Sequence, residues 1–134
     1  MQVDITVDDV AVRQMLTRAP RQIERAQRMA MGDATKHLQK QMKTYPPQRR
    51  GSTYKRTMVL RDSWSIRIEG ANGNITGIVG SNSNSAPYNR LVQDATRQAG
   101  VHRGRWTNTV QAVAERSRDD INRMFQNRLA AELR

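Results

Sequence analysis

The sequence predicts an α+β domain, in which a small antiparallel sheet is covered by a long N-terminal helix and a C-terminal helix. A segment at about residues 60–80 alternates with the period of a strand, and the pair Asn72-Gly73 divides it as a hairpin turn would. Long segments with helical periodicity lie on both sides of it, and a short N-terminal strand precedes the first. No internal repeat or domain-scale linker appears, so we expect a single domain over residues 1–134 with the order β-α-loop-β-β-α.

The N-terminal segment combines a short strand with a helix. Residues 2–7 alternate polar and apolar side chains before Asp8-Asp9, which suits a strand that runs into a helix cap. Helical periodicity follows from about residue 8 to 43, and Pro20 should kink or restart the helix because proline has no N–H to donate. The stripe expected to face a partner element is Val12, Leu16, Ala19, Ile23, Ala26, Ala30, Ala34, His37 and Gln41.

A basic loop and a hairpin form the middle of the chain. Residues 44–59 hold two prolines, a glycine and a cluster of cations without apolar periodicity, which predicts a long loop. Alternation from Leu60 to Glu69 predicts a strand, and residues 75–80 predict its antiparallel partner. The side chains expected to build the sheet face are Leu60, Trp64, Ile66 and Val79.

The C-terminal third predicts one helical turn and one long helix. A single turn suits Tyr88 and Val92. From Thr107 onward the pattern is helical to the end, with Thr107 or Thr109 as the N-terminal cap. Its expected buried stripe is Val110, Val113, Ala114, Ser117, Ile121, Met124, Phe125, Arg128 and Leu129.

Composition favours assembly and an anionic partner. Apolar residues make up 37% of the chain, below the usual figure of about 45–50%, so one subunit can bury only a small core. The 23 Lys and Arg against 12 Asp and Glu give a formal charge of +11, which suits nucleic acid, an acidic protein or an anionic membrane. Between Asp33 and Asp62 there is no acidic residue, and the cations there are Lys36, Lys40, Lys43, Arg49, Arg50, Lys55, Arg56 and Arg61.

The chain lacks the residues that several kinds of chemistry require. The chain has no cysteine, which excludes disulfides, thiolate catalysis and Cys-based zinc sites. His37 and His102 have no metal-ligand spacing around them, and no nucleophile-base pattern appears. We therefore expect no catalytic, cofactor-binding or metal site. No apolar stretch is long enough for a signal peptide or a membrane span, so we expect a protein made in the cytoplasm without a membrane partner.

A series of short motifs resembles one known family. The motifs, in order, are Tyr45-Pro46-Pro47, Tyr54-Lys55-Arg56-Thr57, Leu60-Arg61-Asp62-Ser63-Trp64, Tyr88 with Val92-Gln93, and Gln98, His102 and Trp106 before a terminal amphipathic helix. Over nearly the whole chain this order resembles the tail-completion, or neck, proteins of long-tailed double-stranded-DNA bacteriophages, the head-tail joining family. That family usually reads Thr-Gly-x-Leu-x-x-Ser where this chain has Met58 in place of the glycine.

The resemblance implies a structural virion protein at the head-tail interface, not an enzyme. It implies an α+β subunit that forms a homo-oligomer, often a six-fold ring, between head connector or adaptor subunits and the tail tube or terminator. Double-stranded DNA passes through the channel of such a ring. The positions that carry the resemblance, as structural residues, are Tyr45, Pro46, Thr57, Leu60, Ser63, Trp64, Tyr88, Val92, His102 and Trp106.

The cations of the loop are the candidate contact residues. Tyr88 and Trp106 are expected to brace the loops, whereas the residues expected to contact a neighbouring subunit or DNA are Arg49, Arg50, Lys55, Arg56 and Arg61. Two alternatives remain open. One is a tail terminator or other minor tail protein, and the other, of a different class, is a non-specific nucleic-acid-binding protein that binds in a salt-sensitive way without self-assembly.

Overall fold

The computed structural model describes residues 2–6, 20–48, 50–53, 55–71, 73–94, 96–98 and 106–133. Their elements are β1 (Gln2–Thr6), α2 (Pro20–Lys43), α3 (Val59–Asp62), β2 (Trp64–Ala71), β3 (Asn74–Ser81), α4 (Asn89–Val92) and α5 (Val110–Glu132). The predicted α+β class and the order of its main elements are confirmed, the helical turn expected at Tyr88 and Val92 is present as α4, and the short helix α3 is an addition. α2 begins at Pro20, and the earlier part of the predicted helix lies outside the described residues.

The sheet has three antiparallel strands in the order β1-β3-β2. β2 and β3 pair as a hairpin with Ile66 opposite Val79, and β1 pairs along the other side of β3. Only residues 72 and 73 separate the two hairpin strands, and Gly73 has a φ of 85°. The predicted Asn-Gly hairpin is therefore confirmed, because a two-residue turn of this kind needs positive φ.

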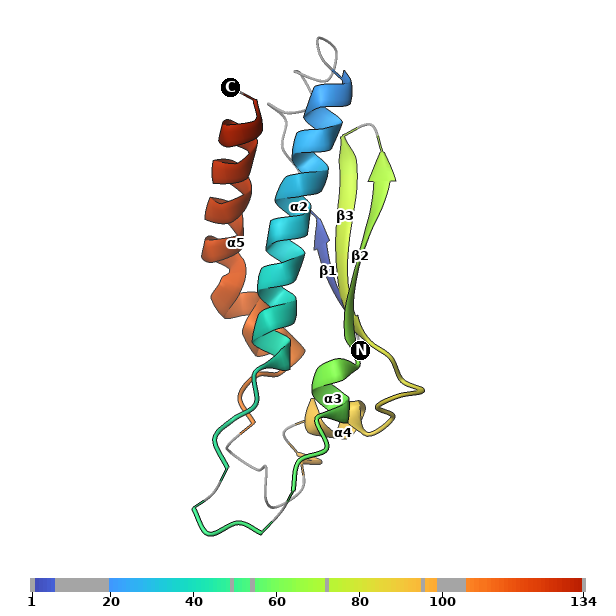
Figure 1. Ribbon diagram of the computed structural model, residues 1–134, viewed down its shortest axis with the longest axis vertical. Helices are drawn as coiled ribbons and strands as arrows, with labels where there is room; N and C mark the ends of the chain where they lie inside the picture. Colours follow the sequence, from blue (N-terminus) through green and yellow to red (C-terminus); the bar gives the residue numbers. More distant parts are fainter. Residues whose placement is uncertain are drawn as a thin grey trace.

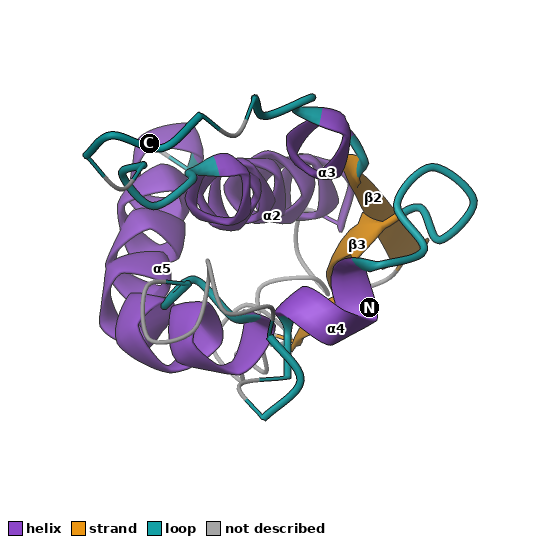
Figure 2. Ribbon diagram, turned by 90° about the horizontal axis from the view of Figure 1, so that it is seen from below, coloured by secondary structure: helices purple, strands orange, loops and turns teal. Residues whose placement is uncertain are grey.

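Both long helices lie to one side of the sheet, as Figures 1 and 2 show, with α2 packed against both the β2–β3 hairpin and α5. The buried apolar side chains of α2 are Ile23, Ala26, Ala30, Met31, Ala34, Leu38 and Met42. Within α2 the residues of the predicted stripe are buried as far as Ala34. The prediction is wrong for the last two, His37 and Gln41. Leu38 and Met42 are buried, whereas His37 and Gln41 are only half-buried, because a helix in contact with two elements buries a wider face than one stripe.

Gly77 of β3 allows α2 to lie close to the sheet. A Cβ atom built at Gly77 would overlap Thr35 Cγ2 and lie 2.7 Å from Met31 Sδ, both on α2. The Thr35 side chain is fully buried, and its hydroxyl donates to the Met31 carbonyl at 2.8 Å. A glycine at this position therefore sets the distance between the helix and the sheet.

α5 follows its prediction closely. Thr109 caps the helix, because its side-chain oxygen accepts from the Ala112 N–H at 3.2 Å. The structure thus selects Thr109 from the two predicted caps. The buried residues of α5, all on the predicted stripe, are Val113, Ser117, Ile121, Phe125 and Leu129.

The start of the predicted strand at Leu60 is wrong. Leu60 and Asp62 lie in the short helix α3, and β2 begins only at Trp64. Ser63 closes α3, since its N–H donates to the carbonyls of Val59 and Leu60. Of the side chains predicted to build the sheet face, Trp64 and Val79 are in the main core with Ile66 packed against it, but Leu60 belongs to a separate cluster.

Candidate functional site

A small second core forms at the end of the molecule opposite the hairpin turn, where α3, α4 and the loop after α2 come together (Figure 1). We call it the loop cluster. Its buried members are Leu60, Ala86 and Trp106, and Tyr45 and Val92 pack against them as half-buried residues. Four of these five residues are positions that carry the family resemblance, and they come from segments far apart in the sequence.

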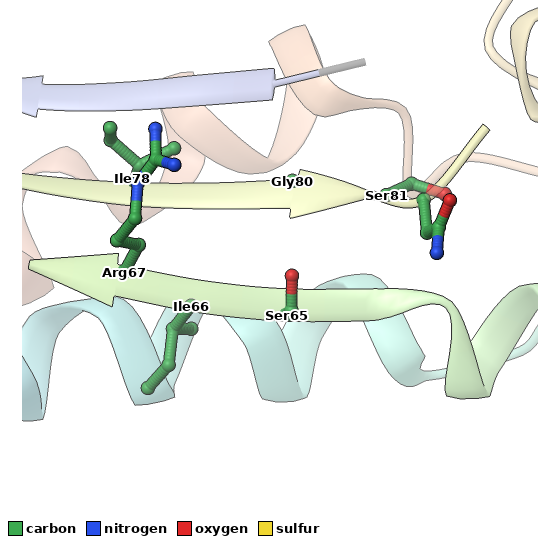
Figure 3. A pocket seen from close by; sticks show the side chains of 7 residues that line it. Ser65, Ile66, Arg67, Ile78, Gly80 and Ser81 are labelled. Carbon is green, nitrogen blue, oxygen red and sulfur yellow. The ribbon is translucent and has the colours of Figure 1, made fainter. Parts of the chain in front are cut away.

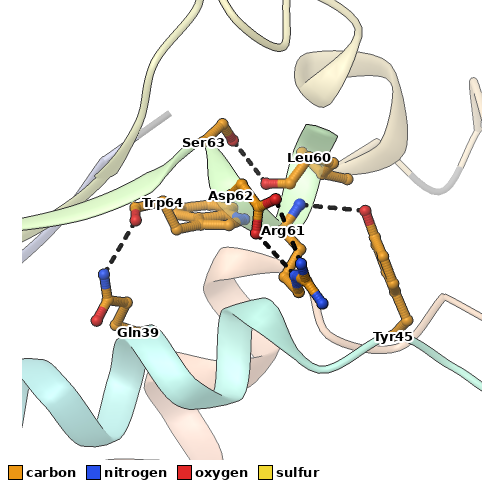
Figure 4. A network of polar contacts seen from close by, with 7 residues as sticks. All are labelled: Gln39, Tyr45, Leu60, Arg61, Asp62, Ser63 and Trp64. Carbon is orange, nitrogen blue, oxygen red and sulfur yellow. Dashed lines mark hydrogen bonds and ion pairs between the residues drawn. The ribbon is translucent and has the colours of Figure 1, made fainter. Parts of the chain in front are cut away.

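Tyr45 is at the centre of the contacts in this cluster. Its ring meets that of Trp106 edge-on, with centroids 5.2 Å apart and an interplanar angle of 63°. The guanidinium carbon of Arg56 lies 5.2 Å from the centroid of the Tyr45 ring, a cation-π distance. The Tyr45 hydroxyl accepts from the backbone N–H of Arg61 at 3.1 Å, as Figure 4 shows.

The hydroxyl of Tyr45 acts as a cap for α3. The first N–H groups of a helix have no partner within it, and the residue at the N-cap position, Met58, makes no side-chain hydrogen bond to them. Tyr45 supplies an acceptor to the third residue of α3 from sixteen positions earlier in the chain. The loop after α2 is therefore attached to α3 by a specific contact.

Met58 has a left-handed backbone, with φ 62° and ψ 9°. It is the one residue other than glycine with positive φ among those described. Left-handed conformations are costly for residues that carry a Cβ atom, and glycine adopts them freely. The resemblance inferred from the sequence leads us to expect glycine at this position.

Ser63 and Trp64 connect the loop cluster to the sheet. The Ser63 hydroxyl donates to the Leu60 carbonyl at 2.6 Å and lies 2.7 Å from the Ser81 hydroxyl at the end of β3. The Trp64 carbonyl accepts from the side-chain amide of Gln39 on α2 at 2.9 Å (Figure 4). The motif that contains Ser63 and Trp64 therefore ends in the main core and not in the loop cluster.

Two side-chain amides join the segments on the α4 side. Gln98 is 4% exposed, and its amide donates to the carbonyls of Val92 at 2.9 Å and Trp106 at 3.3 Å. The Gln93 side-chain oxygen accepts from the Val110 N–H at 2.6 Å. Three motif positions, namely Val92 at the end of α4 and Gln98 and Trp106 after it, are thus brought together, whereas His102 lies outside the described residues.

Asn108 joins the C-terminal end of α2 to the segment before α5. Its side-chain amide donates to the carbonyls of Gln41 at 3.1 Å and Thr44 at 3.0 Å, and its oxygen accepts from Arg116 at 2.6 Å. The Gln41 carbonyl also accepts from the Thr44 N–H at 3.2 Å, so Asn108 adds a second hydrogen bond where α2 ends. The sequence analysis did not identify Asn108, because nothing in the local pattern shows which carbonyls an asparagine side chain will reach.

The candidate contact cations divide into two groups. Arg50 and Lys55 are exposed on the loop, whereas Arg56 packs on Tyr45 and Arg61 pairs with Asp62 at 2.8 Å. The hydrogen bond from Arg61 holds the pKa of the Asp62 carboxyl below its usual value, and the charges of Arg61 and Lys43 act in the same direction. Arg49 lies outside the described residues.

Large apolar side chains are exposed next to the loop cluster. They are Val59 of α3, 39% exposed, Tyr88 at the start of α4, 40%, and Leu91 of α4, 42%. Tyr88 and Leu91 are three positions apart and so share one side of α4. Pro46 and Thr57, two other resemblance positions, lie in the loop, half-buried and exposed respectively.

Potential metal ligands do not cluster among the described residues, and the hollow on the open side of the sheet has no acid-base pair. No three of their His, Asp or Glu side chains come together as a metal cluster would require. One hollow of about 330 Å³ lies on the open side of the sheet, next to Ser65, Arg67 and Ile78 (Figure 3). Its lining has no carboxylate and no histidine, so it offers no acid-base pair.

Within the described part of the chain, no helix has the length and apolar character needed to cross a bilayer. Comparison of the chain with family models, with curated proteins and with solved structures finds no match.

Proposed function

We propose that this chain is a structural subunit of the connector, or neck, ring that joins the DNA-filled head of a tailed bacteriophage or prophage to its tail, and that it is not an enzyme. The convergence of the resemblance positions supports this most directly. These positions come from segments far apart in the sequence. Here Tyr45, Leu60, Val92 and Trp106 pack into one cluster.

The conformation of Met58 gives independent support. The family's glycine corresponds to a position that has φ 62° in this chain. A glycine is favoured in a protein family wherever the backbone is left-handed, for steric reasons. The turn that a glycine would serve is therefore present, although this chain has a methionine there.

The open sheet edges favour self-assembly. β1 and β2 are the outer strands, and no described strand pairs with the outer side of β2. An unpaired edge of eight residues offers N–H and C=O groups to a neighbouring chain. These edges and the small core favour a homo-oligomer. In the proposal it is a six-fold ring that lies between head connector or adaptor subunits and the tail tube or terminator.

The end of the molecule that carries the loop cluster is the proposed contact with those neighbours. Exposed Val59, Tyr88 and Leu91 supply apolar area there, and the basic loop supplies Arg50 and Lys55. An apolar patch beside arginines is typical of protein interfaces. The loop cluster would hold this surface in shape.

A particle-joining assay tests the proposal. In a phage that encodes this chain, a nonsense mutation in its gene should leave DNA-filled heads and tails of normal length that do not join, as seen by negative-stain electron microscopy. Purified protein added to the lysate should restore joined, infectious particles. Joined particles that form without the protein would overturn the proposal.

The same assay separates the alternatives. A tail terminator limits the length of the tail, so its loss should give tails of irregular length. A non-specific nucleic-acid-binding protein, favoured by the +11 charge, should be dispensable for joining.

A further inference from the structure

The solvent side of α2 carries four cations in one row along the helix. At 100° per residue, positions 25, 29, 32, 36, 40 and 43 fall within about 80° of one another, on the side opposite Ala30 and Ala34. We call this row the α2 ridge, and it consists of Arg25, Met29, Gly32, Lys36, Lys40 and Lys43. Arg25, Lys36 and Lys40 are exposed, and Lys43 is half-buried.

The α2 ridge contains no acidic residue. The acids of α2 lie off the ridge and have other partners, since Glu24 pairs with Arg28 at 3.0 Å and Asp33 with Arg128 at 3.3 Å. None of the ion pairs between described residues involves a ridge cation. The exposed side of α5 differs, because Arg118 and Arg123 lie there among Asp119 and Asp120.

The α2 ridge is long and continues into the basic loop. From Arg25 to Lys43 the rise of the helix gives about 27 Å. The charge of Lys43 contributes to the lowered pKa of Asp62, which places the end of the ridge near α3 and Arg61. The loop cations Arg50 and Lys55 follow α2 in the chain, so positive charge continues from α2 into the loop, whose path Figure 1 shows.

We propose that the α2 ridge binds the phosphate backbone of double-stranded DNA. Duplex DNA carries about one negative charge per 1.7 Å of its axis, and lysine and arginine bind it by displacing condensed counterions. Contacts from lysine and arginine to phosphate carry no sequence information, so we expect binding through the ridge to be independent of sequence.

The composition of the α2 ridge favours DNA over the other anionic partners. Protein interfaces have an apolar centre and few lysines, whereas this ridge has three lysines and a single large apolar residue, Met29. Binding to a lipid surface by a helix needs a broad apolar face that enters the bilayer, and the apolar face of α2 is buried against the sheet and α5.

This inference adds a site to the proposed function and does not depend on it. In a connector ring, DNA binding by the α2 ridge would orient α2 toward the channel. Binding to DNA is measured on the purified protein, whereas the joining role is measured on particles. Failure of one therefore leaves the other standing.

The test removes the central cations of the α2 ridge. The variant is Lys36→Gln with Lys40→Gln and Lys43→Gln, and glutamine retains helix propensity close to that of lysine. The control, Arg67→Gln with Arg118→Gln and Arg123→Gln, also removes three positive charges from the net +11, from exposed sites off the ridge, where Arg67 pairs with Glu69 and Arg123 with Asp120. A third variant with arginine at all three ridge lysines keeps the charge.

Binding to a short duplex of two unrelated sequences is measured by fluorescence anisotropy from about 50 to 200 mM salt. We expect the ridge variant to bind at least about tenfold more weakly, with the slope of log affinity against log salt reduced by roughly 2 to 3. The control should lose less than about threefold, and the arginine variant should bind like the wild type. Circular dichroism melting checks that all the variants fold.

Two results would overturn the proposal. One is an equal loss of duplex binding in the ridge variant and the control, which would show that net charge alone governs binding, or no loss in the ridge variant, which would show that the α2 ridge does not hold the duplex. The other is tighter binding to phosphatidylserine-rich vesicles than to duplex at equal phosphate concentration, dependent on the same lysines, which would assign the α2 ridge to a lipid surface.

Discussion

Met58 adopts a left-handed backbone that costs roughly 1–2 kcal/mol for a residue with a side chain. Glycine removes this cost. It also makes the unfolded chain more flexible, and this reduces the gain in stability by about 0.5–1 kcal/mol. We therefore expect Met58→Gly to raise the free energy of unfolding by up to about 1 kcal/mol. Urea denaturation measures the change.

A second substitution at the same position separates backbone strain from side-chain packing. Met58→Ala keeps the Cβ atom and the strain but loses the rest of the side chain, so it should be no more stable than the wild type. If alanine and glycine had the same effect, the left-handed backbone would not be the cause.

Substitutions at Gly77 and Gly32 give a second test at the scale of single residues. Gly77→Ala places a methyl group against Thr35 and Met31 in the tightest helix-sheet contact, so we expect a loss of about 1–3 kcal/mol. At Gly32, within α2, a Cβ atom would lie 3.7 Å from Ile68 Cδ1, an ordinary contact. Gly32→Ala should instead stabilise the protein by up to about 1 kcal/mol. Thermal or urea unfolding of the two variants measures the contrast, and a gain in both would contradict the close packing at Gly77.

At the scale of elements, α3 depends on a contact that is distant in sequence. Tyr45→Phe keeps the ring against Trp106 and Arg56 and removes only the acceptor for the Arg61 N–H. We expect a loss of about 1 kcal/mol and faster hydrogen exchange at Arg61, measured by NMR. Amides in the middle of α2 and β3 serve as the internal control. Their exchange should change only by the global loss, and unchanged exchange at Arg61 would show that the hydroxyl does not cap α3.

The elements that the sequence predicted well are those whose signals are local. The hairpin has its alternation and its Asn-Gly turn within twenty residues, and α5 has both its cap and its stripe. α3 was missed because the alternation of Leu60 and Asp62 continues that of β2. Its actual determinants, a left-handed Met58 and the hydroxyl of Tyr45, leave no periodic pattern.

At the scale of the whole molecule, the sequence predicted several residues of the loop cluster but not the contacts between them. The order of the motifs selected Tyr45, Leu60, Val92 and Trp106, but only the folded chain brings these distant positions into one cluster. Arg56 and Arg61 were predicted as contacts for a partner, and the structure gives both of them a second role inside the chain. Such roles depend on long-range packing, which residue order alone does not specify.

The molecule has two kinds of surface for two kinds of partner in this account. Sheet edges and the exposed apolar residues of α3 and α4 would bind protein, whereas the α2 ridge would bind DNA. Assembly through backbone pairing and apolar contacts should change little with salt concentration. DNA binding should weaken as the salt concentration rises.

The mass of the purified protein in solution tests the central claim, that the chain assembles by itself into a ring. Light scattering across a range of protein concentrations, at low and high salt and with and without short duplex DNA, gives that mass directly. The account predicts a discrete oligomer of several 15.3 kDa subunits that forms without DNA and persists at high salt. A monomer at every concentration, which gains mass only by salt-sensitive binding to DNA, would contradict it.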